Sequence, residues 1–139
     1  MASKTPANIN NSFAERWHHE LAPDGHTQVS NYFLAHYHRL SPDLTHGEAM
    51  FVIHLMQHKW DEKAPFPSYA TLAKRMTVSV KTARRYAISL AQKKYLHREL
   101  RVGATNRFYL DRLIEALVNL RRKDAGLAAL KPGEFRRKP

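Results

Sequence analysis

Several features that would place a chain in a particular cell compartment are missing from this sequence. It contains no cysteine among its 139 residues, which excludes disulfide bonds and thiolate metal sites. The N-terminus lacks the apolar core of a signal peptide, and no apolar run approaches the roughly 20 residues of a membrane-spanning helix. We therefore expect a cytoplasmic protein.

Motifs that carry catalysis are also missing. The chain has only five glycines and no glycine-rich loop that cradles a nucleotide. It has neither a nucleophile motif nor a carboxylate cluster with an evident chemical task. We therefore expect no catalytic residues and no cofactor, and we predict that the chain is not an enzyme.

Metal binding is the ligand chemistry that the composition invites, because the chain has nine histidines. His54 and His58 have the i, i+4 spacing that places two imidazoles on one face of a helix. No aspartate, glutamate or third histidine stands at a spacing that completes a site, and the pair lies in an apolar stretch. We interpret both as partly buried histidines and predict no metal ligands.

Acidic residues are scarce in one part of the chain. Glu99 is the single acidic residue in segment 67–110, which holds ten of the 23 lysines and arginines and has a net charge of +9. Segments 1–44 and 45–66 each carry −1, and segment 111–139 carries +4. A charge that served solubility alone would mix both signs over the surface. Its concentration in one segment predicts a surface that binds a polyanion such as DNA.

The first residues predict an N-terminal arm over residues 1–24. Residues 1–11 are polar and rich in asparagine, which predicts a disordered lead. Ser12 and Glu15 have capping-box spacing, so we expect a short helix to begin there. Its apolar residues recur at helical intervals and are Phe13, Trp17 and Leu21. The turn signal Pro23-Asp24-Gly25 ends the arm.

Residues 25–110 carry the signals of a helical domain. A short strand is expected at residues 26–29, followed by a helix that buries Phe33, Leu34, Tyr37 and Leu40. Helix N-caps are predicted at Ser30, Thr45, Ser68 and Ser79, and Thr45 has capping-box spacing with Glu48. The helix that follows Thr45 is strongly apolar and ends near Trp60, so we expect it at the centre of the core.

The last two of these helices lie close together in the sequence. They are joined by the short turn Thr77-Val78, which predicts a helix-turn-helix. Residues 96–102 and 107–110 then alternate apolar and polar side chains around a turn, which predicts a two-stranded hairpin. We expect Asp111 to cap a last helix, followed by a basic tail that ends the third part of the chain, residues 111–139. The apolar stripe of that helix is Leu113, Ile114, Leu117 and Leu120.

Helical geometry selects the residues that face a DNA groove. If Ala83, Ala87 and Leu90 face the core, then the outward residues are Val80, Lys81, Arg84, Arg85 and Ile88. Arginine near the start of such a helix is well suited to a bidentate bond with guanine. We therefore assign base contacts to Lys81, Arg84 and Arg85. The full set of predicted DNA-binding residues is Ser68, Ser79, Lys81, Thr82, Arg84, Arg85, Arg98, Arg101, Asn106 and Arg107.

Two plainer interpretations of these cations stay open. Arg84 and Arg85 can form a solvated basic face, and the arginines of the hairpin can protect an edge strand from aggregation. Among the hairpin arginines we rank Arg101 and Arg107 above Arg98, because they flank the turn most closely.

Segment 45–110 also carries a family resemblance. Its distinctive residues are Phe66-Pro67-Ser68, Leu72-Ala73, Val78-Ser79, Thr82, Leu90 and the Lys-Lys-Tyr-Leu sequence that leads into the hairpin. They resemble the winged helix-turn-helix modules of plasmid and phage replication initiators, replisome organisers and related bacterial regulators.

The resemblance implies that helix 79–94 enters the major groove through Lys81, Arg84 and Arg85, and that the hairpin contacts the flanking backbone through Arg101 and Arg107. The family usually has a glycine where this chain has Met76-Thr77, and another where Lys94 or Tyr95 stands. We therefore expect a turn that is tighter or displaced by one residue.

The fold class that follows is mainly α with a small β-hairpin, a winged helix-turn-helix with N- and C-terminal helical extensions. The leading functional hypothesis is a sequence-selective double-stranded DNA-binding protein of the nucleoid or of a plasmid, acting as a plasmid or phage replication factor or a transcriptional regulator. The alternative is a non-enzymatic assembly or accessory protein that uses the winged helix for contacts with another protein and binds nucleic acid only without sequence preference. The apolar residues of the arm and of the last helix either pack back on the body of the protein or contact a second subunit, and we expect a homodimer through one of them.

Overall fold

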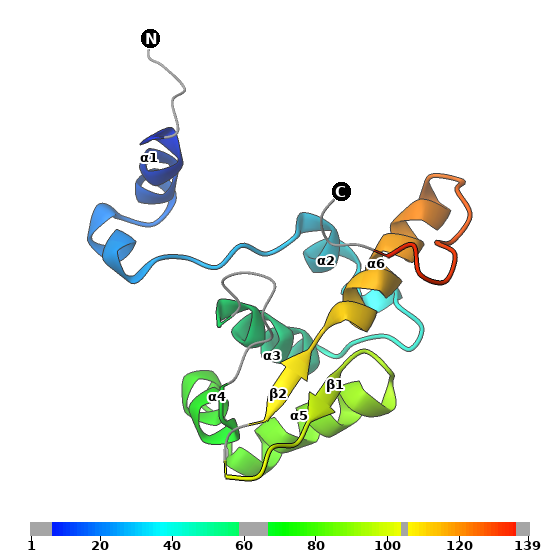
Figure 1. Ribbon diagram of the computed structural model, residues 1–139. Helices are drawn as coiled ribbons and strands as arrows, with labels where there is room; N and C mark the ends of the chain where they lie inside the picture. The colour runs from blue at the N-terminus through cyan, green and yellow to red at the C-terminus, as the bar shows by residue number, and fades with distance from the viewer. Residues whose placement is uncertain (1–6, 59–66, 104–105, 136–139) are drawn as a thin grey trace.

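The computed structural model describes residues 7–58, 67–103 and 106–135 and, for residues 7–11, the backbone alone. The described chain is mainly helical with one two-stranded antiparallel sheet, which confirms the expected fold class (Figure 1). Its elements are α1 (Ala7–Arg16), η1 (His19–Asp24), α2 (Asn31–His36), η2 (Tyr37–Arg39), α3 (His46–Gln57), α4 (Tyr69–Met76), α5 (Val80–Gln92), β1 (His97–Glu99), β2 (Arg107–Tyr109) and α6 (Asp111–Asp124).

The helices of the domain begin where the sequence predicts. Each N-cap hydroxyl accepts a hydrogen bond from the amide three residues later, at 3.0 to 3.2 Å, for Ser30, Thr45, Ser68 and Ser79. The capping box at Thr45 is complete, because the Thr45 amide also donates to Glu48 Oε1 at 2.8 Å. These starts were predictable because the bonds that fix them span only three residues.

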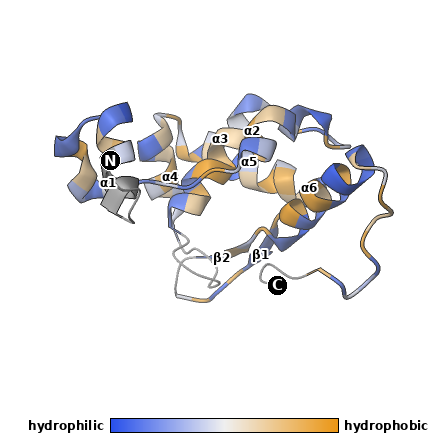
Figure 2. Ribbon diagram, turned by 90° about the horizontal axis from the view of Figure 1, so that it is seen from above, coloured by the Kyte–Doolittle hydropathy of each residue, from blue (hydrophilic) through white to orange (hydrophobic). Residues whose placement is uncertain are grey.

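The core lies where α3, α4 and α5 meet. Phe51 and Leu55 of α3 have no exposed surface, and they pack with Leu72 of α4 and Leu90 of α5. The hairpin of β1 and β2, which we call the wing (residues 96–110), adds Phe108 to the same cluster, and α6 adds Leu113. Figure 2 shows α6 apolar along its first part and hydrophilic at its C-terminal end. One expected core residue of α2 is outside the cluster: Leu34 is half exposed, whereas Phe33 and Leu40 are buried.

The turn between α4 and α5 contains no glycine. Thr77 takes the left-handed conformation with φ 57° and ψ 47°, and the amide of Val78 donates to the Ala73 carbonyl at 3.0 Å. Lys94 takes a similar conformation after the end of α5, with φ 70°. Two residues with side chains therefore adopt the conformation that glycine adopts without steric cost, near the positions where the family has glycine.

The hairpin is shorter than predicted. Only three residues pair on each strand, with Arg98 opposite Phe108 and Glu99 opposite Arg107. The last helix begins one residue earlier than predicted, because Asp111 is its first residue and not its cap. Leu110, a buried residue that joins β2 directly to the helix, occupies the cap position, and its hydrocarbon side chain cannot supply a capping hydrogen bond.

The arm differs most from expectation. Residues 7–11 are helical, and Ser12 lies inside α1, so the capping box predicted there is wrong. Neither Pro nor Gly interrupts residues 7–16, so no helix breaker prevents the helix from beginning upstream of Ser12. The strand expected at 26–29 is also absent, because the described part of the chain offers this segment no pairing partner. In Figure 1 the arm stands apart from the domain.

None of the helices in the described ranges combines the length and the apolar character that crossing a lipid bilayer requires.

Candidate nucleic-acid interface

The N-terminal half of α5 presents the predicted base-contacting residues together. Lys81, Arg84 and Arg85 are exposed, while Ala83 and Ala87 on the opposite face are fully buried. The cap positions this half of the helix, because Ser79 Oγ accepts from the Thr82 amide and donates to Thr82 Oγ1, both at 3.0 Å. The exposed side of the N-terminal half of α5 therefore carries three cations.

Tyr69 joins this helix to the wing. The Arg84 guanidinium carbon lies 5.3 Å from the centre of the Tyr69 ring, a cation–π contact. On the other side, Arg98 of β1 donates through Nη1 to the Tyr69 hydroxyl at 3.2 Å. The ring also packs edge-on against Phe108, with 5.9 Å between ring centres. One aromatic residue thus holds a cation from α5 and a cation from the hairpin beside each other.

Sequence reasoning missed this role for Tyr69. Its spacing with Leu72 and Met76 indicated a core residue, and the ring does pack on the core cluster. The signal that could have revealed the role is its position, directly after the Ser68 cap and therefore at the edge of α4. Which residues it would contact depends on tertiary packing, because Arg84 and Arg98 are far from it in the sequence.

The wing arginines do not all lie in one place. Arg98 faces the same side as Phe108, because cross-strand partners share a face, and this brings it to Tyr69. Arg107 Nε lies 3.8 Å from Glu99 Oε1, on the other face of the hairpin. Arg101 is partly exposed in the segment after β1, and Asn106 is partly exposed before β2. The structure thus brings Arg98 to the tyrosine that Arg84 of α5 also contacts, and the ranking of Arg101 and Arg107 above Arg98 stays a prediction.

Ser68 occupies a different environment from the other predicted residues. Its hydroxyl accepts from the Thr71 amide at 3.0 Å and donates to Thr71 Oγ1 at 2.9 Å in a partly buried position. Both of these bonds belong to the start of α4.

Four aliphatic side chains are exposed among these cations. Val80 and Ile88 lie on the outward face of α5, 40% and 37% exposed. Leu100 is 74% exposed and Val102 is fully exposed, both just beyond the end of β1. The surface is therefore mixed, with basic groups and aliphatic groups side by side.

The C-terminal end of α5 is anchored by a buried carboxylate. Glu48 is only 3% exposed, and its Oε1 accepts from Lys93 Nζ at 2.6 Å while Ser89 Oγ donates to Oε2. Burial raises the pKa of the Glu48 carboxyl, but the hydrogen bonds from Lys93, Ser89 and the Thr45 amide outweigh it, so the pKa lies below its ordinary value. The charged carboxylate therefore ties α5 to the first turn of α3.

His54 of α3 and His58, directly after α3, both lie near Arg75. His58 Nε2 lies 2.8 Å from Arg75 Nη1, and Arg75 also donates to Gln57 Oε1 at 2.8 Å. Burial lowers the pKa of His54 and of His58, and the nearby Arg75 charge lowers both further. A guanidinium at this distance competes with a metal ion for the same nitrogen.

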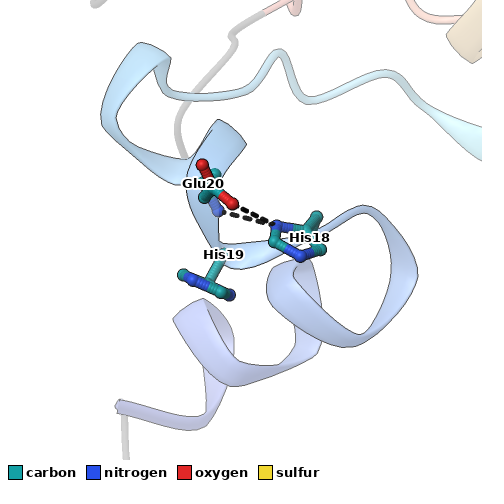
Figure 3. Close-up of side chains that lie close together, drawn as sticks. All are labelled: His18, His19 and Glu20. Carbon is teal, nitrogen blue, oxygen red and sulfur yellow. Dashed lines mark hydrogen bonds and ion pairs between the residues drawn. The ribbon is translucent and has the colours of Figure 1, made fainter.

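A different histidine cluster lies in the arm. Within the ranges the structure covers, the one group that offers three metal-ligand atoms within 4.8 Å of each other is His18, His19 and Glu20 (Figure 3). All three are exposed, and the rings of His18 and His19 stack with 4.3 Å between their centres. His18 Nδ1 accepts from the Glu20 amide at 3.1 Å, so its lone pair is already used. We therefore assign no metal site to this cluster.

Comparison with known proteins identifies the type of domain that carries these residues. Residues 43–96 match the family model described as a helix-turn-helix domain. This range holds α3, α4 and α5, and the hairpin follows immediately. The chain carries a winged helix-turn-helix domain. This confirms the resemblance to winged helix-turn-helix proteins of replication and regulation. Because helix-turn-helix domains dock on duplex DNA, the domain indicates DNA as a partner.

The similarity extends beyond the winged helix-turn-helix domain. The crystal structure of the N-terminal domain of DnaD protein from Geobacillus kaustophilus HTA426 matches with a TM-score of 0.58 and 25% sequence identity. The match covers 91% of this chain and 96% of that chain, so it includes helical extensions as well as the domain. No curated protein sequence matches the chain significantly.

Proposed function

We propose that this chain is a sequence-selective double-stranded DNA-binding protein without enzymatic activity. Helix α5 reads the major groove, and the wing, residues 96–110, contacts the flanking backbone. The observation that carries the proposal is the Tyr69 contact with both Arg84 and Arg98, because it brings one cation of the helix and one cation of the wing to the same side chain. Phosphate contacts supply most of the affinity of such a surface, and base contacts supply the preference for sequence.

The outward face of α5 suits this division of work. Lys81, Arg84 and Arg85 are exposed and positioned for hydrogen bonds to guanine or for phosphate contacts. Val80 and Ile88, on the same face, suit contacts with the methyl group of thymine. Ser79 and Thr82 stand at the start of the helix, where the positive end of the dipole favours a phosphate.

The biological role that we propose is that of a replication factor of a plasmid or phage, or of a transcriptional regulator, located at the nucleoid or on a plasmid. It is supported by the resemblance of segment 45–110 to replication initiators and replisome organisers, and by the similarity to the DnaD N-terminal domain over most of the chain.

We also infer a homodimer formed through the arm. Trp17 is 70% exposed and Leu21 is 47% exposed, although both are large apolar side chains. By contrast, Leu113 of the last helix is buried, and Leu117 packs against the core, so the apolar stripe of α6 is largely used within the chain. An apolar cavity of about 350 Å³ between α2, α3 and α6 lies beside Val29, just after the arm. Sedimentation of Trp17→Ser/Leu21→Ser and of the unchanged protein tests this, and equal masses would contradict it.

Selection of bound fragments from a random duplex pool at near-physiological salt tests the DNA-binding function. We expect an enriched motif, with twofold symmetry if the protein is a dimer. Equal and strongly salt-dependent affinity for random duplex, single strands and RNA would instead support the assembly protein, which the exposed apolar residues of the arm also suit.

A further inference from the structure

Two exposed aliphatic residues at the end of the wing have no role in the proposed reading of DNA. Leu100 and Val102 lie beyond Glu99, the last residue of β1, on either side of Arg101 in the sequence. Leu100 is 74% exposed and Val102 is fully exposed. A single exposed aliphatic residue needs no explanation. These two lie close together in the sequence, just after β1 and in the most basic segment of the chain, and we call them the apolar tip.

The charge around this tip favours DNA as its partner. Segment 67–110 has a net charge of +9, and its single carboxylate, that of Glu99, already lies 3.8 Å from Arg107 Nε. The positive charge around the tip is complementary to the phosphates that line a DNA groove. Proteins that bind the minor groove commonly insert leucine or a similar apolar wedge between base pairs, which partly unstacks one step and kinks the duplex.

The position of the wing sets where such a wedge would act. The base of the hairpin is held to α5 through Tyr69, which contacts Arg98 on β1 and Arg84 on α5. If α5 lies in the major groove, the end of the hairpin reaches past the adjoining backbone toward the neighbouring minor groove. In Figure 1 the segment after β1 runs toward the end of the molecule where α5 begins.

We propose that Leu100 and Val102 form a wedge that enters the minor groove beside the site read by α5, unstacks a base step and bends the DNA. The inference rests on the proposed function for its partner and adds an activity to it, the distortion of the duplex. Burial of the two side chains offsets part of the cost of unstacking, and this cost is lowest at flexible pyrimidine–purine steps. The wedge therefore favours such a step at a fixed distance from the motif.

The test measures the shape of the bound DNA. The probe is a duplex of about 30 base pairs with a fluorescent dye at each end, carrying the selected motif, or random sequence if no motif is enriched. Energy transfer between the dyes reports bending, and 2-aminopurine placed in the flanking minor-groove segment reports unstacking. The variants are Leu100→Ser/Val102→Ser, the matched control Leu127→Ser, which changes an exposed leucine in the tail, and Arg101→Gln.

We expect the unchanged protein to bend the duplex by tens of degrees, roughly 20–90°. Leu100→Ser/Val102→Ser should bind a straight duplex with less than tenfold loss of affinity and without rise in 2-aminopurine fluorescence. Leu127→Ser should bend DNA like the unchanged protein, and Arg101→Gln should bind more weakly but still bend. Circular dichroism melting should show the double variant folded, because both side chains are exposed and lie outside the strands.

Two results would overturn the wedge: a straight duplex in the complex of the unchanged protein, or equal bending by the double variant. If a motif is enriched but the DNA stays straight, the wedge fails and the proposed function stands. If no motif is enriched but bending disappears in the double variant, the wedge stands and sequence selectivity fails. No binding to any duplex would overturn both.

Discussion

The two ends of α5 differ in how their polar groups are used. At the C-terminal end, Ser89 and Lys93 bind the buried carboxylate of Glu48, so their hydrogen-bonding groups are satisfied inside the protein. At the N-terminal end, Lys81 and Arg85 are exposed, and Arg84 rests on the Tyr69 ring. The same helix is thus fixed at one end and presented to a partner at the other. Changes at the fixed end should affect stability, and changes at the presented end should affect binding.

Replacement of Glu48 by alanine should give the largest effect. The substitution removes the buried carboxylate that accepts hydrogen bonds from Lys93, Ser89 and the Thr45 amide. Because these donors then lose their acceptor, we expect the free energy of unfolding to fall by about 3 kcal/mol. Urea denaturation followed by circular dichroism measures this. Glu99→Ala, at an exposed glutamate, is the matched control and should be nearly neutral. Reduced DNA affinity in a Glu48→Ala protein of unchanged stability would refute the division between the two ends.

Changes at the presented end should have the opposite signature. Arg84→Ala or Arg85→Ala should weaken DNA binding by about 1–3 kcal/mol and relax the preference at one or two base pairs, with unfolding unchanged. Fluorescence anisotropy on the selected motif and on single-base variants measures this. Arg112→Ala removes the same charge from the exposed start of α6 and is the control. An equal loss of affinity for every sequence would leave Arg84 and Arg85 as phosphate contacts only.

Acid should weaken the fixed end first. The pKa of Glu48 is lowered in the folded protein, so its stabilising contribution is present above the unfolded value of about 4.5 and is lost as the pH falls through the folded pKa. Glu48→Gln should therefore flatten the fall in thermal stability below about pH 4.5. Hydrogen bonds from Arg39 and Tyr32 also lower the pKa of Asp124, so part of the acid sensitivity should remain. An unchanged pH profile in Glu48→Gln would show that Glu48 is not held as a carboxylate.

A residue in the left-handed conformation that is not glycine lies near each end of α5: Thr77 before it and Lys94 after it. The same substitution can therefore be tested at both ends. Thr77→Gly and Lys94→Gly should each raise the free energy of unfolding by about 0.5–1 kcal/mol, because the steric cost of this conformation exceeds the entropic cost of glycine. Thermal melting measures the gain. A loss at Thr77 would show that its side chain makes contacts worth more than the relieved backbone cost.

The smallest expected effect is at Tyr69, between α5 and the wing. Tyr69→Phe keeps the ring under Arg84 and removes the hydroxyl that accepts from Arg98. We expect a loss of about 0.5 kcal/mol in DNA binding, measured by anisotropy, and little change in stability. Tyr69→Leu should cost more binding, since both cations then lose their support. If Tyr69→Phe binds as tightly as the unchanged protein, the hydroxyl contact does not align the wing.

The sequence predicted the features that depend on local chemistry. Ser68 and Ser79 bond to amides three residues away, so their capping roles follow from spacing alone. The exposed face of α5 follows from the same regular geometry once Ala83 and Ala87 are assigned to the core. Local spacing also misled, because Ser12 and Glu15 have capping-box spacing yet lie within α1, where nothing in three residues distinguishes a cap from a helix interior.

Features that depend on contacts across the chain could not be predicted. Glu48 was expected only as part of a capping box, and its bonds to Ser89 and Lys93 span more than forty residues. The helical spacing of Tyr69 with Leu72 and Met76 likewise indicates only a core residue, because its contacts with Arg84 and Arg98 depend on distant parts of the chain. The pairing of Arg107 with Glu99 depends on the register of the hairpin, which the alternation of residues 96–102 and 107–110 does not define.

Leu110 alone separates β2 from α6, and it is buried. No loop separates the strand from the helix, so we expect β2 and α6 to move together. At the C-terminal end of α6, Asp124 accepts two hydrogen bonds from Arg39, at 2.7 and 2.9 Å, and these connect α6 to η2. We therefore expect that a change at the Arg39–Asp124 pair is transmitted along α6 to the orientation of β2.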